Sequence, residues 1–211
     1  GKKMKKSVFL YVFDTMGDWE IAYITAEINS GRFFKKGSPS LKLVTVGNDT
    51  SEVTTMGGLK IKPDVEISAL KPKDIIDLVL PGGDTWLDPL HDAILAVAEQ
   101  CLKDNIVVAA ICGATFGLAG KGLLNARPHS SNDLEFLKAV CPAYSGEAFY
   151  QNQPAVTDGN LITASGIAPL EFSAQVFAKL DVFTPEIVDS WYQLYNTRDP
   201  KYYSMLMNAI Q

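Results

Sequence analysis

The residue best placed to do chemistry in this sequence is Cys112, at the end of a short apolar run. Val107 to Ile111 is continuous and apolar, as expected of a strand covered on both faces, and Gly113 to Ala119 is mostly small and helix-competent. A thiol at a helix N-terminus meets unpaired N–H groups and the positive end of the dipole, which favour its thiolate. Cys112 is therefore predicted to be a nucleophile at a strand-to-helix elbow. The alternative is a structural cysteine buried in the core.

Two further features are expected beside this thiol. Glu20 lies near the start of the first predicted helix, and a carboxyl next to a thiolate is pushed towards protonation and can donate a hydrogen bond to sulfur. The alternative is an ordinary first-turn glutamate. Gly82 and Gly83 let backbone N–H groups approach a reacting oxygen and, with the N–H of Gly113, predict an oxyanion hole. The alternative for the glycines is a tight turn that ends a strand.

The chain has only two histidines. His91 follows Pro89 and Leu90 and is predicted to be a surface residue, so His129 is the one candidate for a general base. No histidine or cysteine cluster has metal-ligand spacing, and no glycine-rich stretch completes a phosphate-binding motif. We therefore expect neither a metal nor another cofactor.

The elements that must position these residues alternate between strand and helix. Predicted strands cover residues 7–13, 41–46, 77–80 and 107–111, predicted helices cover 19–31, 90–103, 133–140 and 169–180, and a hairpin turns at Asp158-Gly159. Trp19 is expected on the inner face of the first helix. The alternation predicts an α/β fold with a mostly parallel sheet, whose active crevice lies beyond the carboxyl ends of the strands. The loop after Phe13, the turn at residues 81–83 and Cys112 all meet there.

Composition limits the possible partners. The chain has 211 residues, 47% of them hydrophobic, and a net charge of −5, which predicts one globular domain without nucleic-acid partners. No apolar run is long enough to span a membrane. Three cysteines in a chain of this length do not form a disulfide framework, so we expect a cytoplasmic location.

The domain boundaries follow from the same patterns. Residues 1–6 form a basic tail, part of which is expected to be an expression remnant. Residues 7–180 form the domain, and residues 181–211 form a helical C-terminal extension of it. The extension is rich in aromatic residues and is predicted to bury them against the domain, with a subunit contact as the alternative.

Four motifs resemble a known superfamily. They are Leu80-Pro81-Gly82-Gly83, Ala109-Ala110-Ile111-Cys112-Gly113-Ala114, Gly122-Leu123-Leu124 and Thr157-Asp158-Gly159-Asn160-Leu161-Ile162-Thr163-Ala164. In this order they resemble the PfpI-type intracellular peptidases, which are related to class I glutamine amidotransferase domains. That superfamily includes the Parkinsonism-associated deglycase and chaperone branch. The resemblance runs from Ser7 to Leu180.

The resemblance implies a flavodoxin-like three-layer sandwich, a homodimer and a set of site residues. It implies Cys112 as nucleophile, Glu20 as its protonated partner, and the N–H groups of Gly83 and Gly113 as the oxyanion hole. The histidine of the peptidase branch directly follows the cysteine, and Gly113 stands there. The histidine of the deglycase branch aligns with Asn132. Because side chains alternate along a strand, this alignment turns Asn132 towards the thiol and His129 away from it.

The predicted function is that of a cysteine-dependent hydrolase or deglycase-like enzyme acting on a small carbonyl or amide substrate. The pocket depends on the loop at residues 84–88, where Trp86 is expected to form a wall. Glutaminase activity is not expected, because no late His-x-Glu pair follows His129. The alternatives are an oxidative-stress sensor based on Cys112 and a chaperone-like binding domain without turnover.

Overall fold

A seven-stranded sheet forms the centre of the protein. The structure is a computed structural model that describes residues 6–211, so the predicted basic tail lies outside the described residues except for Lys6. The strand order is β5-β2-β1-β6-β7-β9-β8. All neighbouring strands are parallel except β8 and β9, which are antiparallel. The strands are β1 (Ser7–Tyr11), β2 (Leu43–Gly47), β5 (Val65–Glu66), β6 (Ile75–Leu80), β7 (Val107–Ile111), β8 (Ala155–Asp158) and β9 (Leu161–Ala164). A separate small hairpin pairs β3 (Val53–Thr54) with β4 (Lys60–Ile61).

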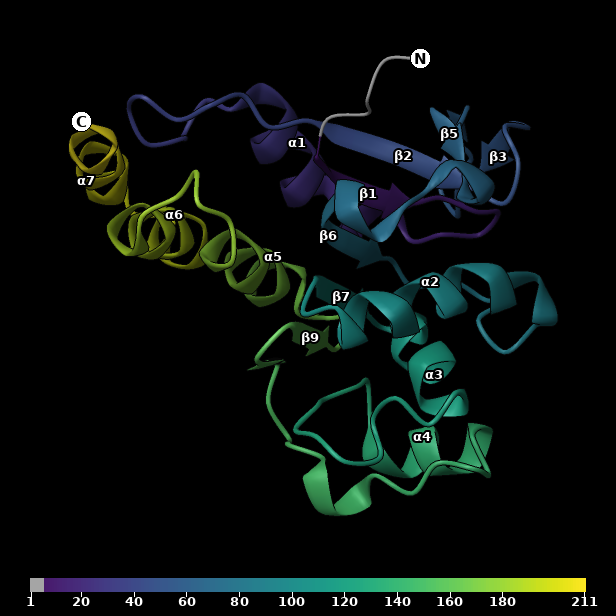
Figure 1. The fold of residues 1–211 in the computed structure, drawn as a ribbon. Helices are drawn as coiled ribbons and strands as arrows, with labels where there is room; N and C mark the ends of the chain where they lie inside the picture. The colour runs from purple at the N-terminus through teal and green to yellow at the C-terminus, as the bar shows by residue number, and fades with distance from the viewer. Residues whose placement is uncertain (1–5) are drawn as a thin grey trace.

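Helices cover both faces of the sheet, as Figure 1 shows. On one side lie α1 (Ala22–Ser30), α5 (Pro169–Ala178), α6 (Pro185–Thr197) and α7 (Lys201–Ile210). On the other lie α2 (Asp92–Lys103), α3 (Gly113–Gly120) and α4 (Leu134–Val140). The predicted three-layer α/β fold with a mostly parallel sheet is confirmed.

The central strands explain why the carboxyl edge of the sheet is well defined. All five residues of β1 are buried, and Val108 to Ile111 of β7 are fully buried, which accounts for their unbroken apolar sequences. Parallel register aligns Leu80 with Ala110 and Ile111 with Ala164. The loops that follow β1, β6, β7 and β9 therefore emerge side by side.

The first helix differs from the prediction. Residues Asp18–Glu20 form a 3-10 turn, and α1 begins only at Ala22. The tighter winding of the 3-10 turn aims Glu20 into the protein, where it is 1% exposed. It leaves Trp19 48% exposed, so the expectation that Trp19 lies on an inner face is wrong.

The C-terminal extension forms two helices, α6 and α7. Trp191 of α6 is buried, and its indole N–H donates a 2.7 Å hydrogen bond to Glu27 of α1. Arg32 donates to the same carboxylate at 2.7 Å. The Trp191 contact attaches the extension to the domain and places this aromatic residue in the core.

Candidate active site

Cys112 lies in the sharp turn between β7 and α3. Its backbone has φ 60° and ψ −128°, a left-handed conformation that is rare for a residue with a side chain. Such a conformation costs about 1–3 kcal/mol and is found mainly at functional sites. The strain turns the half-buried thiol out of the sheet and places it at the N-terminus of α3.

The backbone approaches the thiol closely at two glycines. A Cβ on Gly82 would lie 2.6 Å from Cys112 Cβ and 2.8 Å from each carboxyl oxygen of Glu20, so Gly82 occupies the space between the acid and the thiol. A Cβ on Gly166 would lie 2.8 Å from the sulfur. Any side chain at either position would displace one of the reacting groups.

Glu20 lies in the loop after β1, and its carboxyl faces the thiol. Burial raises the pKa of Glu20 to about 8, while hydrogen bonding by the Gly82 N–H and the Cys112 thiol opposes that rise. Its Oε2 atom is buried, and within residues 6–211 it has no hydrogen-bond partner of good geometry. This carboxyl oxygen is available to exchange a proton with the thiol or a bound molecule.

The thiol itself differs from the prediction that the elbow favours its thiolate. Burial and the negative charge of Glu20 raise the pKa of Cys112, and they outweigh the hydrogen bonds from Asn132 and the Gly113 N–H that lower it. Two negative charges so close together repel, so ionisation of Glu20 disfavours ionisation of Cys112.

Asn132 lies beside the sulfur. Its side-chain Nδ2 donates to Cys112 Sγ at 3.3 Å, and its Oδ1 accepts the N–H of Gly166 at 2.8 Å. The second bond fixes the orientation of the amide, because only an oxygen can accept from a backbone N–H. Asn132 therefore presents a donor to the thiol.

His129 lies on the other side of its segment. Its Nδ1 is 2.8 Å from the carbonyl oxygen of Arg127, its Nε2 is bound to the Tyr144 hydroxyl, and the ring is fully buried. Burial also lowers the pKa of His129. Both ring nitrogens are engaged in these contacts, and the side chain that donates to the sulfur is Asn132.

The candidate oxyanion donors lie next to each other. An added Cβ on Gly113 would be 2.7 Å from Gly83 O and 3.4 Å from Gly83 N, so the two backbones are in contact. Within the described part of the chain no acceptor takes the N–H of Gly83. The loop carrying Gly83 is held by the Asp84 N–H, which donates to Thr15 Oγ1 at 3.0 Å. Gly82 is less suited, since its N–H faces Glu20.

His91 and Trp86 pack next to the loop that carries Gly83. His91 is 0% exposed rather than a surface residue, because its ring nitrogens lie 2.7 Å from Tyr11 Oη and 2.8 Å from Thr85 Oγ1. Its ring stacks on Trp86 at 4.5 Å, and the Trp86 indole donates to Pro81 O at 2.8 Å. Trp86 is 2% exposed and packs against Gly113 and Gly117. Trp86 lines a hollow beside Gly83 and is absent from the lining of the hollow over Cys112.

A hollow of about 580 Å³ opens over the thiol. It is lined by Trp19, Cys112, Asn132, Ser165, Gly166, Ile167 and Pro169. Sequence reasoning did not assign Trp19, Gly166 or Ile167 to the site, because the loop after β9 carries no chemical motif. The topology of the sheet could have pointed to the loop after β9, because β9 is parallel to β7 and ends at the same edge.

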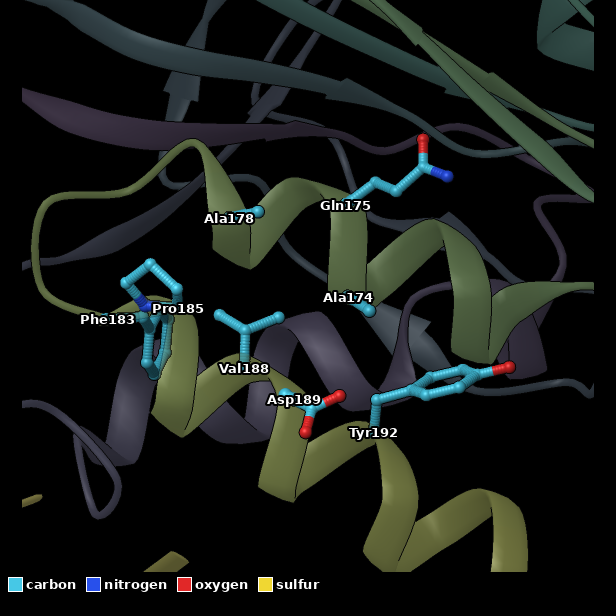
Figure 2. Close-up of a pocket in the computed structure, with 8 residues that line it drawn as sticks. All are labelled: Ala174, Gln175, Ala178, Phe183, Pro185, Val188, Asp189 and Tyr192. Atoms are coloured by element: carbon cyan, nitrogen blue, oxygen red, sulfur yellow. The ribbon is translucent and has the colours of Figure 1, made fainter. Parts of the chain in front are cut away.

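A groove elsewhere on the surface lies between α5 and α6 (Figure 2). It is lined mainly by small and apolar residues, with Gln175, Asp189 and Tyr192 as its polar members, and it holds no cysteine or histidine. Its lining contains none of the candidate site residues. In residues 6–211 no group of three or more His, Cys, Asp and Glu side chains is arranged to hold a metal ion. No described helix has the length and apolar character needed to cross a membrane.

Comparison with known proteins agrees with the fold and its motifs. A model of the DJ-1/PfpI family matches residues 6–179. A Bacillus subtilis protein named uncharacterized protease YoaZ is 53% identical over 207 residues, covering 97% of this chain and 98% of that protein. The crystal structure of a ThiJ/PfpI family protein from Bacillus anthracis has a TM-score of 0.92 and 51% identity, covering 99% of both chains. A DJ-1 superfamily protein from Agrobacterium tumefaciens has a TM-score of 0.79 and 33% identity, covering 92% of this chain and 98% of the other.

Proposed function

The chain belongs to the DJ-1/PfpI family, and we propose that it is a cysteine-dependent hydrolase acting on small carbonyl, ester or amide compounds. The observation that carries the proposal is the strained conformation of Cys112, which holds a thiol against a buried carboxyl and a fixed amide donor. Strain at a non-glycine residue persists only where its surroundings enforce it. Here those surroundings are a proton carrier and hydrogen-bond donors.

The proposed reaction begins with a proton transfer within the pair. In the ionised form of Glu20, which is the minor form at neutral pH, the carboxylate takes the thiol proton, and the side-chain N–H of Asn132 stabilises the thiolate. The sulfur attacks the substrate carbonyl carbon, an S–C bond forms, and the carbonyl electron pair moves to oxygen. The N–H groups of Gly83 and Gly113 stabilise that oxyanion.

Collapse of this intermediate returns the proton. The bond to the leaving group breaks, and the Glu20 carboxylic acid protonates the departing oxygen or nitrogen while an S-acyl enzyme remains. Glu20, again a carboxylate, then takes a proton from water, and the resulting hydroxide attacks the thioester carbonyl. The C–S bond breaks, the acid is released, and Glu20 returns its proton to the departing sulfur, which restores the thiol and the carboxylate. A pKa of about 8 suits a group that both accepts and donates near neutral pH.

The site suits esters and activated amides better than peptides. Two relatives from Bacillus subtilis are named as uncharacterized proteases. Peptide cleavage requires protonation of a poor amine leaving group, the usual task of an imidazole. His129 is engaged with Arg127 and Tyr144, so Glu20 is the acid available here. We therefore expect esters and activated amides to react faster than peptides.

We also propose a cytoplasmic location and a homodimer for the protein. All three cysteines are free, which suits a reducing compartment. The exposed side chains of Leu87 and Phe136 are candidates for a subunit contact.

The proposal is tested by turnover of p-nitrophenyl acetate, with Cys112→Ser compared with wild type. We expect the serine variant to lose about 10³-fold or more of the rate, because an alcohol in this position lacks a strong base. Cys141→Ala is the matched control, since Cys141 is buried at the end of α4. Equal turnover by Cys112→Ser and wild type would remove Cys112 from the reaction.

A further inference from the structure

The hollow over Cys112 has an apolar rim that the proposed chemistry does not use. Trp19 is 48% exposed and Ile167 is 93% exposed, and both line the hollow together with Pro169. Single exposed apolar residues are common on protein surfaces. Here large ones flank a thiol in a concave surface, which is the usual arrangement of a binding site for an apolar group.

The rim is held in place by hydrogen bonds. The Trp19 indole N–H donates to Gly166 O at 2.9 Å, which ties the 3-10 turn after β1 to the loop after β9. The N–H of Gly166 in turn donates to Asn132, and the N–H of Ala168 donates to Ser165 O at 3.0 Å. The apolar surface therefore keeps a fixed position relative to the sulfur, which reduces the entropy lost when a ligand binds.

The charged side chains near the hollow also favour an uncharged ligand. In the described part of the chain, no lysine or arginine lines the hollow. A neighbouring hollow of about 300 Å³ beside Gly83 is also mainly apolar, lined by Trp86, Leu87, Phe116, Phe136 and Val140, with Asp84 as its charged member. An anionic group would therefore lose its hydration without finding a cation to pair with.

We propose that the site selects uncharged carbonyl compounds with an apolar substituent, and that this substituent binds in the hollow between Trp19 and Ile167. The inference rests on the proposed function, because it places the reacting carbonyl at Cys112 and the N–H groups of Gly83 and Gly113. Compounds with a carboxylate on the same substituent are rejected. Trp19 and Ile167 act as specificity residues and not as catalytic ones.

The test measures selectivity of the thiol without requiring turnover. Rates of Cys112 alkylation are measured with iodoacetamide, iodoacetate and N-benzyl iodoacetamide, in each of which the sulfur displaces iodide and the thiol proton leaves to solvent. Each rate is divided by that of N-acetylcysteine with the same reagent at the same pH, which removes intrinsic reactivity. Mass mapping assigns the adduct to Cys112.

We expect the normalised rate for the benzyl reagent to exceed that for iodoacetamide by about tenfold, since a few tens of Å² of apolar surface become buried. We expect iodoacetate to be slower than iodoacetamide by about tenfold, because its carboxylate loses hydration without a cation to pair with. Equal normalised rates for the three reagents would overturn the proposal. A benzyl reagent slower than iodoacetamide would also overturn it and would show that the hollow is covered, as by a second copy of this chain.

Variants then assign the selectivity to the rim. Trp19→Ala should reduce the benzyl preference by about fivefold through lost apolar contact. Ile167→Lys adds a cation at a highly exposed position and should reverse the discrimination against iodoacetate. Met205→Ala, at an exposed apolar position on α7, is the matched control and should leave both ratios unchanged.

The two proposals fail in different ways. Selective labelling in a protein that turns over no ester would support the binding site and contradict the hydrolase. Ester turnover together with unselective labelling would support the hydrolase and contradict the rim as a specificity element.

Discussion

Glu20 and Asp77 are two buried carboxyls at opposite ends of the same sheet. Each is 1% exposed, and burial raises the pKa of each to about 8. Each also has a carboxyl oxygen without a hydrogen-bond partner in residues 6–211. Glu20 lies in the loop after β1, at the carboxyl edge of the strands, whereas Asp77 lies near the start of β6, at the amino edge.

The difference between the two lies in their neighbours. Glu20 faces a strained cysteine across Gly82, and a hollow opens over that cysteine. The charge nearest Asp77 that affects its pKa is that of Lys179, and the cavity it borders contains no cysteine or histidine. A raised pKa therefore reports burial at both places. Only at the carboxyl edge does the geometry add a nucleophile.

The most damaging change to the pair should be Gly82→Ala. The new Cβ would overlap both the Cys112 side chain and the Glu20 carboxyl, so we expect a loss of about 10³-fold in Cys112 alkylation at neutral pH or in ester turnover. Gly120→Ala is the control, because its Cβ would meet nothing within 4 Å. A Gly82→Ala variant with wild-type rates would show that the acid and the thiol do not need this spacing.

Glu20→Gln should lower turnover at neutral pH by about 10²-fold, since an amide cannot accept the thiol proton. Asp77→Asn makes the same chemical change at the other end of the sheet and should leave turnover unchanged. Circular dichroism checks that both variants fold. Similar losses of turnover in the two variants would mean that the effect of Glu20 is structural.

Asp77 should instead control the pH dependence of stability. Its folded pKa of about 8 lies above the unfolded value near 3.9, so the folded state binds more protons between these limits and stability falls as pH rises through that window. Asp77→Asn removes this dependence. We expect the variant to be more stable than wild type by about 2 kcal/mol at pH 8 and by less at pH 5, measured by urea unfolding. A parallel shift at both pH values would contradict a buried neutral Asp77.

The smallest effects on the reaction are expected for substitutions of Asn132 and His129. These substitutions should distinguish the roles of the two residues. Asn132→Ala removes the hydrogen bond to the sulfur and the acceptor of the Gly166 N–H, so it should slow alkylation by about tenfold and lower stability only slightly, because Asn132 is exposed. His129→Ala leaves the Arg127 carbonyl and the Tyr144 hydroxyl without their partner, so it should lower the melting temperature while the rate per folded molecule is unchanged. If His129→Ala alone abolished turnover in a folded protein, histidine would be the base.

Much of this arrangement follows from sequence. Continuous apolar runs define β1 and β7, and the parallel topology brings Glu20, Gly83 and Cys112 to one edge. The orientation of His91 does not follow, because its burial depends on Tyr11 and Thr85, which are distant or unremarkable in sequence. The net rise in the pKa of Cys112 also requires the depth of burial, which local spacing does not contain. The same holds for Trp19, whose exposure depends on one 3-10 turn.

The central claim is that Cys112 and Glu20 share a proton. It is tested most directly by following thiolate absorbance with pH in a protein whose other cysteines, Cys101 and Cys141, are replaced by alanine. With Glu20 present, Cys112 should ionise over two coupled steps, because the second charge forms next to the first. With Glu20→Gln in the same background a single step should remain. Identical single-step curves for the two proteins would contradict the account.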